Sequence, residues 1–510
     1  MSRSLIATAT EPGEIQVLSS RSFLLVVAVL LLTVGAGLRV FRLGDRSLWY
    51  DEAVTANASR GTSAQVLEET RQFSAPVIHP YILYLAERVG KSAVAVRAPS
   101  VVASLLAVLL MLVMVRVKVS RNAALFSAAI LAVSASQIRY AQEVREYSLA
   151  VLFAAILIYS LLSWETAGSR SGHPALLYAA LFIAPLIQYG LVFFAFAILS
   201  TIALRLLLTR STCFSLSRAV IASGFLAAGG LLSFFLTLRY QFHAGKTQWY
   251  LAENYFDPKT MSFVHFLSTN STGLLNFLIP GHVIDLCFVV CAVIFCILQV
   301  LGRKYDTITL LIFASISISI CASVARVYPY GGVRQCLFLA PVVALFAGVA
   351  FADLLERIKG PLRPAATAGV MVLIVLSLFR GMLQQWPYTE VEDTRSVLKE
   401  LAKSMAPSDQ VWVNHDAVAA FEFYLLKKDP RFTYGKFHAD ANEYNPELIR
   451  SIDPHTDRLW LVFSHLEQAS DRGEQQLIVN SLRADWDVQR VIAPTNAELY
   501  LAQRRTSPKV

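Results

Sequence analysis

Residues 22–53 read SFLLVVAVLLLTVGAGLRVFRLGDRSLWYDEA. The stretch begins with an apolar run, 22–38, that has about the length a helix needs to cross the hydrocarbon core of a membrane. It ends with a Trp-Tyr pair that is followed directly by two acids, Asp51 and Glu52. Adjacent carboxylates beside aromatic rings, immediately outside a membrane span, indicate a chemical site rather than a solubilising surface.

The composition supports a membrane protein. Of 510 residues, 55% are hydrophobic and only 16% are charged, which is less charge than a soluble chain of this size carries. Apolar runs of membrane-spanning length recur over the first three quarters of the chain, and we expect about eleven spans. The expected spans are 22–38, 94–115, 122–138, 147–164, 174–188, 190–208, 219–238, 282–300, 307–325, 335–355 and 365–383.

Basic residues in the short loops predict the orientation. The first span has no convincing cleavage site after it, so we expect it to be retained and the N-terminus to be cytoplasmic. Lys and Arg fall in alternate loops, and the positive-inside rule makes those loops cytoplasmic. Several arginines nevertheless lie on the opposite side, at helix ends. These are Arg39, Arg42, Arg46, Arg139, Arg145, Arg326 and Arg334. Singly each could be an interfacial side chain; together they suggest an anion.

After residue 383 the chain becomes polar. We expect residues 1–383 to form a membrane module and residues 384–510 a separate soluble domain, which an odd number of spans would place on the extracytoplasmic side. The tail is acidic and the membrane part is basic, so the net charge of +9 reflects membrane topology and not nucleic-acid binding. Helical patterns at 389–405, 417–427 and 474–483 alternate with strand patterns at 410–414, 458–464, 488–492 and 498–502. This alternation predicts a small α/β domain.

The first extracytoplasmic loop, 39–93, is long for a polytopic protein, and such loops commonly carry function. Helical stretches are expected at 51–59 and 62–71. An acid at the start of a helix also stabilises that helix, so Asp51 has a structural interpretation beside the chemical one. Further along the loop, two prolines bracket His79 and tyrosines follow at helical spacing.

Four motifs in order resemble the GT-C glycosyltransferases: Trp-Tyr-Asp51-Glu52-Ala after the first span, His79-Pro-x-x-x-Tyr84 before the second, Arg-x-Pro-Ser at 97–100 opening it, and Arg139-Tyr-Ala-Gln-Glu143-Val-Arg145-Glu-Tyr after the third. The closest branch is the bacterial group related to protein mannosyltransferases and to the aminoarabinose and rhizobial lipopolysaccharide sugar transferases. A later element, Tyr-Pro-Tyr330-Gly-Gly-Val-Arg334, adds to the resemblance, which covers roughly residues 20–350.

The resemblance implies a polytopic helical enzyme of the bacterial inner membrane. Its donor would be a sugar on a polyprenyl phosphate, and its acceptor a lipid, a polysaccharide or a protein on the extracytoplasmic side. Such enzymes typically invert the anomeric centre, which calls for a carboxylate to deprotonate the acceptor and cations to stabilise the leaving phosphate.

By the same resemblance Asp51 is the expected general base. Glu52 is an alternative base, or a residue that orients the site; on a helix the two side chains diverge by about 100°. Guanidinium groups match phosphate oxygens, so Arg334, Arg145 and Arg139 are expected phosphate ligands, although Arg145 could instead pair with a neighbouring glutamate. The expected substrate-binding residues are His79, Tyr84, Glu143, Gln188, Tyr189 and Tyr330. No cofactor is implied, and a divalent cation held by His79 with Asp51 or Glu52 stays an open option.

Two other functions remain open from the sequence. A transporter or flippase for lipid-linked sugars could also be a polytopic basic protein, but would carry charges near the middle of the membrane and paired halves. A ligase or polymerase using diphosphate-linked glycans would share the topology without requiring Asp51 and Glu52. The sequence does not reveal which sugar is moved or to which acceptor.

Overall fold

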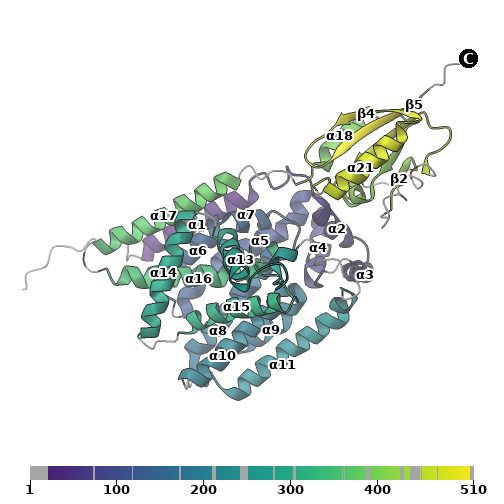
Figure 1. Ribbon diagram of the computed structural model, residues 1–510. Coiled ribbons are helices and arrows are strands. Elements are labelled where there is room, and N and C mark those ends of the chain that lie inside the picture. The colour runs from purple at the N-terminus through teal and green to yellow at the C-terminus, as the bar shows by residue number, and fades with distance from the viewer. Residues whose placement is uncertain are drawn as a thin grey trace, which may run out of the picture.

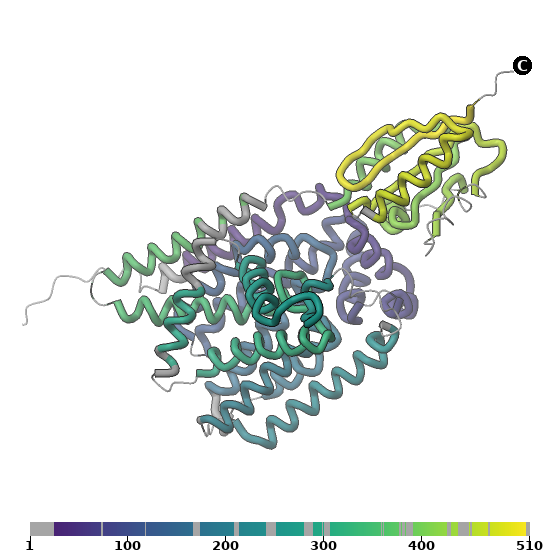
Figure 2. The backbone as a smooth tube through the Cα atoms, in the orientation of Figure 1, coloured from purple at the N-terminus to yellow at the C-terminus, as the bar shows by residue number. Residues whose placement is uncertain are grey.

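The computed structural model describes most of the chain. The described residues are 21–72, 75–117, 119–171, 174–209, 214–241, 251–279, 282–301, 306–358, 360, 362–385, 391–425, 430–436, 448, 451–467 and 469–505. They form a large helical body and a small domain with a β-sheet, which lies at one end of the body (Figure 1). The backbone trace in Figure 2 shows the same two parts.

Every one of the eleven expected spans contains a helix. These helices are α1 (Arg21–Val40), α5 (Ala93–Val113), α6 (Arg121–Val133), α8 (Tyr147–Ser171), α9 (Ala175–Ile187), α10 (Gly190–Thr209), α11 (Leu216–Ser233), α14 (His282–Leu301), α15 (Thr307–Val324), α16 (Ala340–Glu356) and α17 (Leu362–Gln385). Among the described residues, six helices are long and apolar enough to cross a membrane by themselves, or seven if a bent pair counts as one span. The chain is therefore a multi-pass membrane protein.

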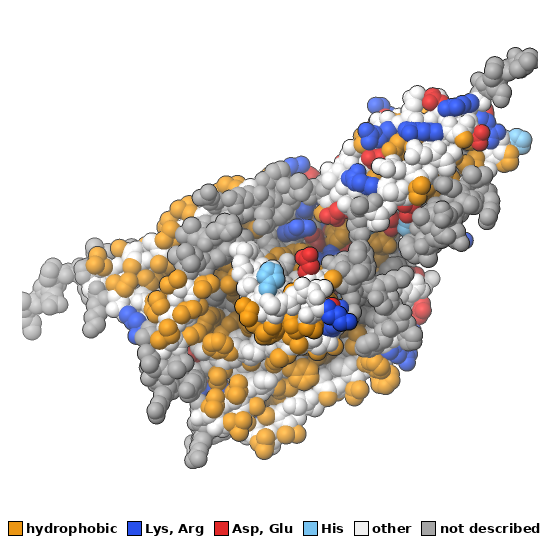
Figure 3. Space-filling model, in the orientation of Figure 1, with side chains coloured by type: hydrophobic (Ala, Val, Ile, Leu, Met, Phe, Trp, Pro, Cys, Tyr) orange, Lys and Arg blue, Asp and Glu red, His pale blue; other side chains and the backbone are white. Residues whose placement is uncertain are grey.

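The spans differ in how far they are enclosed by their neighbours. The span Arg334–Glu356, which includes α16, has 83% of its apolar window buried inside the protein, whereas that of Leu216–Leu238, which includes α11, has 22%. The outer face of α11 exposes Val220, Ile221 and Phe225. Figure 3 shows apolar side chains spread over the helical body, while charged side chains gather on the sheet domain. An exposed apolar surface of this kind suits lipid as its surroundings.

The third expected span is broken. α6 ends at Val133, Ser134 is extended, and the short helix α7 (Ala135–Ala141) leaves at an angle of 57°. A helix that ends inside the protein needs partners for its last carbonyls. Arg39, which is fully buried, donates to the carbonyl oxygens of Leu131 (2.8 Å) and Ala132 (2.7 Å). One of the arginines that sequence placed at the outer helix ends thus caps a broken span.

The long first loop carries three helices: α2 (Tyr50–Ala58), α3 (Ser63–Gln72) and α4 (Ile78–Val89). The first two match the helical stretches that the sequence predicted. A further helix, α13 (Phe263–Leu278), lies between the seventh and eighth spans, where the sequence predicted only a loop. Its N-cap Ser262 accepts the backbone N–H of His265, which is a common start for a helix.

The sheet domain has five strands in the order β2-β1-β3-β5-β4. The strands are β1 (Gln410–Val413), β2 (Phe432–Tyr434), β3 (Arg458–Phe463), β4 (Trp486–Ile492) and β5 (Glu498–Arg504). β1 is parallel to β2 and β3, whereas β5 is antiparallel to β3 and β4. The four predicted strands are all present, and β2 was missed because it is only three residues long and half-buried.

Helices cover both faces of this sheet. One core joins α21 (Ala469–Leu482) to the sheet through Ile478 and Leu482, and a second joins α18 (Thr394–Ser404) and α19 (Val418–Tyr424) to the opposite face through Leu401 and Phe421. The domain is therefore an α/β layer structure, as the sequence predicted. The boundary after residue 383 stays a prediction, because residues 386–390 lie outside the described part of the chain.

Candidate active site

The site is built around the first turn of α2. Trp49 precedes the helix in an extended conformation, and Asp51 and Glu52 occupy its first turn, where the helix dipole favours acidic side chains. The two carboxylates point in different directions. Glu52 is 1% exposed and faces the helical body, whereas the side chain of Asp51 is 23% exposed. Only Asp51 is therefore accessible to a substrate.

The carboxylate of Glu52 forms an ion pair with Arg97, which lies near the start of α5. The guanidinium donates from Nε to Oε1 (2.9 Å) and from Nη2 to Oε2 (2.7 Å), and the backbone N–H of Val144 also donates to Oε1 (2.8 Å). Both side chains are 1% exposed. A buried, bidentate pair of this kind fixes the orientation of α2 on the helical body. Of the two roles that the sequence left open for Glu52, this geometry favours orienting the site.

Asp51 faces Arg334, the first residue of the 3-10 helix η5 (Arg334–Leu339) that leads into α16. Nη2 of Arg334 lies 2.8 Å from Oδ2 of Asp51. Burial opposes ionisation of Asp51, but the positive charges of Arg145 and Arg334 and the hydrogen bond from Arg334 outweigh it and lower the pKa of the carboxyl below its usual value. Asp51 is consequently a carboxylate at neutral pH.

Arg145, in the turn before α8, is the second cation at this carboxylate. Its Nη1 donates to Oγ1 of Thr55, one helical turn after Asp51 (3.2 Å), and its Nε lies 3.6 Å from Oε2 of Glu146. The ion pair with Glu146 is the alternative that the sequence left open for Arg145. It is present, but it is long and leaves part of the guanidinium directed toward α2.

Aromatic rings frame the two arginines. The guanidinium of Arg334 lies 5.2 Å from the ring centre of Trp49 and 5.9 Å from that of Tyr147, and Arg145 lies 5.7 Å from Tyr147. Rings at this distance attract a cation and restrict its rotamers. Tyr147 was quoted in a motif but was not among the predicted site residues, although it is the ring that both arginines share.

His79 lies behind this cluster, buried at 3% exposure in α4. Burial lowers its pKa to about 4; the charge of Glu146 opposes that shift and the charge of Arg145 adds to it. The ring is therefore neutral at neutral pH, and Nε2 is buried with no hydrogen-bond partner among the described residues. Among those residues no group of three His, Cys, Asp or Glu side chains is placed to hold a metal ion.

Arg139 and Glu143 form a pair whose carboxylate is close enough to Glu52 for the two charges to interact. Nε of Arg139 is 3.4 Å from Oε1 of Glu143, and the side chain of Arg139 is 46% exposed. Burial raises the pKa of Glu143, opposed by the charge of Arg139 and reinforced by that of Glu52. The side chain of Arg139 is thus partly accessible to solvent.

Three predicted substrate-binding residues have other partners. Nε2 of Gln188 lies 3.5 Å from the carbonyl oxygen of Gln335, so Gln188 contacts the backbone of the residue that follows Arg334. The hydroxyl of Tyr189 is 3.1 Å from that of Thr237. Tyr330 is 1% exposed and its hydroxyl is 2.9 Å from that of Ser271. Tyr330 therefore anchors the loop before Arg334.

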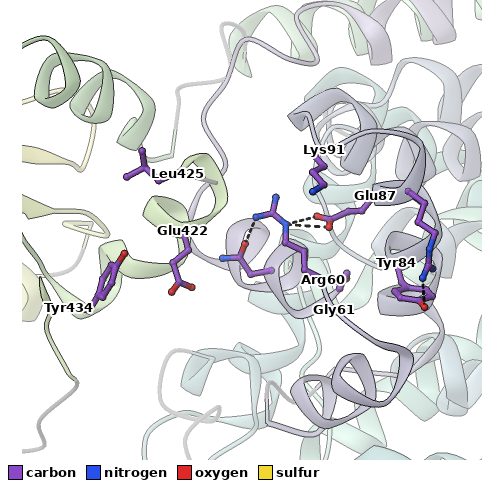
Figure 4. A pocket seen from close by; sticks show the side chains of 11 residues that line it. Arg60, Gly61, Tyr84, Glu87, Lys91, Glu422, Leu425 and Tyr434 are labelled. Atoms are coloured by element: carbon purple, nitrogen blue, oxygen red, sulfur yellow. Dashed lines mark hydrogen bonds and ion pairs between the residues drawn. The ribbon is translucent and has the colours of Figure 1, made fainter. Parts of the chain in front are cut away.

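Tyr84 does not lie in the cluster around Asp51. It lines a cavity of about 530 Å³ between the first loop and the sheet domain. Figure 4 shows Arg60 directed toward Glu87 on one side, Tyr84 below them, and Glu422 and Tyr434 of the sheet domain opposite. Nε of Arg60 donates to Oε1 of Glu87 at 3.0 Å. A polar cavity with tyrosine rings on two sides is of the size that small ligands occupy.

The sequence also missed two residues of the sheet domain, Glu392 and His465, which contact Tyr50 beside Asp51. No local pattern could have indicated them, because their contact with α2 joins segments from opposite ends of the chain.

Residues 74–236 match the family model for dolichyl-phosphate-mannose-protein mannosyltransferase, and no curated protein sequence matches the chain. The structure of ArnT from Cupriavidus metallidurans bound to undecaprenyl phosphate is similar, with 12% identity, a TM-score of 0.56, and coverage of 94% of this chain and 97% of that one. The archaeal oligosaccharyltransferase AglB from Archaeoglobus fulgidus, in complex with an inhibitory peptide and a dolichol-phosphate, gives 11% identity, a TM-score of 0.55, and coverage of 94% and 74%. The GT-C fold that the motifs implied is confirmed.

Proposed function

We propose that this chain, a member of the GT-C superfamily of membrane glycosyltransferases by its fold, moves a sugar from a polyprenyl phosphate to a hydroxyl group of an acceptor, with inversion at the anomeric carbon. One observation carries the proposal: Arg334 and Arg145 converge on the half-buried carboxylate of Asp51 at the ends of membrane helices. The neighbour ArnT holds undecaprenyl phosphate and AglB holds a dolichol-phosphate, which supports a lipid phosphate as the sugar carrier.

In the proposed reaction Asp51 accepts the proton of the acceptor hydroxyl. The acceptor oxygen forms a bond to the anomeric carbon from the face opposite the phosphate, and the bond from that carbon to the phosphate oxygen breaks. The polyprenyl phosphate leaves with the bonding electron pair, and its charge is balanced by Arg334 and Arg145. The proton passes from Asp51 to solvent, so no covalent intermediate with the protein is needed.

Because Asp51 and Arg334 form an ion pair, the donor must bind before Asp51 becomes an effective base. Without a donor, Arg334 is shared with Asp51 and keeps the carboxylate a weak base. A donor phosphate bound at Arg334 takes over part of that cation and adds a negative charge nearby. Both changes raise the pKa of Asp51, so the base becomes stronger only when the donor is in place.

The remaining predicted residues take supporting roles in this proposal. Arg139, with its exposed head, is a third phosphate contact, and Glu143 holds it. His79 fills the space behind Arg145, and Gln188 supports the backbone beside Arg334. The proposed acceptor side includes Tyr84 and its cavity; Tyr189 and Tyr330 maintain the loops.

We further propose that the protein lies in a bacterial inner membrane with its N-terminus cytoplasmic. The sheet domain, from about residue 384, would then lie outside the cytoplasm, together with Asp51. Basic loops on the side opposite to Asp51 support this orientation.

A turnover assay tests the proposal. The purified protein in lipid is given a panel of radiolabelled sugars on polyprenyl phosphate, with diphosphate-linked glycans included, and both donor binding and sugar release are measured. Asp51→Asn and Arg334→Ala are compared with Asp45→Asn, a matched control in the same loop whose exposed carboxylate pairs with Arg42. We expect Asp51→Asn to bind donor without turnover and Arg334→Ala to bind it weakly, with Asp45→Asn unchanged.

Other results would point elsewhere. Full activity of Asp51→Asn contradicts Asp51 as the base. Binding of a donor without turnover of any donor by the wild type favours the transporter, and turnover of diphosphate-linked glycans alone favours a ligase or polymerase.

A further inference from the structure

The helix that carries Asp51 does not cap its own start. A helix leaves its first backbone N–H groups without partners inside the helix, and the residue before it commonly supplies a side chain to accept one. Trp49 occupies that position in α2 and makes no such hydrogen bond. The N–H of Tyr50 is accepted instead by Oε2 of Glu392, at 3.0 Å, from the segment that enters the sheet domain.

Glu392 is held rigidly in this position. Its side chain is 0% exposed, and both oxygens have further partners. The hydroxyl of Ser464 donates to Oε2 at 3.0 Å, and Nδ1 of His465 lies 2.6 Å from Oε1. The hydroxyl of Ser464 is in turn 3.0 Å from that of Thr394, at the start of α18. The cap is thus fixed by two separate elements of the sheet domain.

The backbone of His465 adopts an uncommon conformation in this arrangement. Its φ is +61°, in the left-handed region that few residues other than glycine adopt, although histidine, like asparagine, is found there more often than most. The conformation turns the imidazole onto Tyr50, with the two ring centres 5.1 Å apart and the planes tilted by 37°. His465 therefore contacts both Glu392 and the residue before Asp51.

The rest of the junction holds the sheet domain against the first loop. The hydroxyl of Tyr424 accepts the N–H of Leu48 at 2.7 Å, and Asn57 donates to the carbonyl oxygen of Ala419 at 2.7 Å. Arg395 donates to the carbonyl oxygen of Gly44 at 2.8 Å. These contacts lie before and after the first turn of α2, so the two parts meet in a fixed register at the site.

We propose that the sheet domain completes the active site, with Glu392 and His465 as positioning residues that cap and clamp the first turn of α2 and so set the place of Asp51 relative to Arg334. This inference rests on the proposed function for the role of Asp51. The structural part, the cap itself, can be measured without any assay of activity.

The test uses the full-length protein in lipid. Glu392→Ala removes the cap, Glu392→Gln keeps one acceptor oxygen, and His465→Asn keeps a residue that tolerates positive φ while removing the ring. The control is Glu498→Ala, another buried acid of the sheet domain whose hydrogen bonds, from Gln475 and Tyr500, stay within that domain. Hydrogen exchange of residues 49–53 and the donor KM and kcat are measured on the folded fraction of each variant.

For Glu392→Ala we expect exchange in the first turn of α2 to rise about tenfold and kcat to fall roughly ten- to a hundredfold with donor KM nearly unchanged. Glu392→Gln should recover part of both losses, and His465→Asn should give a smaller loss of kcat. Unchanged exchange and unchanged kcat in Glu392→Ala, or equal effects in Glu498→Ala, overturn the inference. If Asp51→Asn retains turnover, the proposed function fails, whereas the exchange result still decides whether Glu392 caps α2.

Discussion

Nη2 of Arg334 lies 2.8 Å from Oδ2 of Asp51, so the cation proposed to hold the leaving phosphate already holds the proposed base. Asp51 and the donor phosphate therefore compete for the guanidinium of Arg334. A donor cannot bind Arg334 without changing the basicity of Asp51, and this coupling makes the pH dependence of the reaction informative.

We expect the acid limb of kcat to lie at higher pH than the acid limb of kcat/KM. The first reports Asp51 in the donor complex, where Arg334 is shared with phosphate, and the second reports Asp51 in the free protein, where its pKa is lowered. Steady-state rates over a pH series measure both. In Arg334→Gln the acid limbs of kcat and kcat/KM should lie at nearly the same pH. Acid limbs that coincide in the wild type would contradict the transfer of Arg334 from Asp51 to the donor phosphate.

Glu52→Gln should destabilise the protein by about 3–5 kcal/mol, because it leaves the buried charge of Arg97 uncompensated. Thermal unfolding in detergent measures the change. The double variant Glu52→Gln with Arg97→Gln should lose less than the sum of the single variants, since the two side chains form one pair. If folded Glu52→Gln protein has no activity while Asp51→Asn retains full activity, Glu52 and not Asp51 is the base.

The junction at the sheet domain should weaken as the pH rises. Burial disfavours a charged His465, but its hydrogen bond to Glu392 and the nearby charges of Glu392, Asp416 and Asp471 raise its pKa from 6.5 to about 9. Burial, reinforced by Asp471 and Glu474 and opposed by His465, raises the pKa of Asp416 from 3.8 to about 7. Both groups hold their proton more tightly in the folded state, so each favours folding at low pH and loses that contribution as the pH rises through its folded pKa.

The unfolding temperature of the full chain should accordingly fall over two ranges: from about pH 3.8 to 7 through Asp416, and from about pH 6.5 to 9 through His465. His465→Asn should remove the upper part of the fall and Asp416→Asn the lower part. A wild-type curve that stays level up to about pH 9 would show that these protons are not linked to folding.

Tyr84→Ala should raise the acceptor KM about tenfold and leave the donor KM unchanged, because Tyr84 lines the cavity at the sheet domain and not the arginine cluster. Tyr81→Ala is the matched control, since Tyr81 lies on the same helix and bonds to Ser63 outside that cavity. Kinetics at saturating donor measure the effect. A larger change in donor KM than in acceptor KM would remove this cavity from the acceptor side.

Gly331→Ala should weaken donor binding through the loop that carries Arg334. Gly331 has φ +142°, and an added Cβ would collide with the side chains of Asn270 and Asn254. The backbone strain and the collision together should destabilise the present loop conformation by roughly 1–3 kcal/mol. The loop should therefore shift, and Arg334 with it. The control is Gly360→Ala, at φ +78° with no atom within 4 Å of the new Cβ. Equal donor affinity in the two variants would show that the loop absorbs the substitution without moving Arg334.

Much of the fold could be predicted from the sequence, because hydrophobic length and strand alternation are local properties. The break at Ser134 could not, since the apolar run continues through it and the end of α6 is stabilised by a distant residue, Arg39, which donates to the carbonyl oxygens of Leu131 and Ala132. Within the site, Asp51 and Arg334 were predicted from motifs, but their contact was not. Which of two adjacent acids faces the substrate is decided by Arg97, and the sequence order alone does not pair Arg97 with Glu52.

The pair formed by Asp51 and Arg334 joins residues more than half the chain apart. During synthesis Asp51 therefore emerges and takes its place beside the membrane long before its cation is translated. A ribosome-bound or truncated chain that ends before η5 carries the carboxylate without the arginine, and one that ends after α17 still lacks Glu392. The order of translation thus delays assembly of the site until the sheet domain has folded onto the first loop.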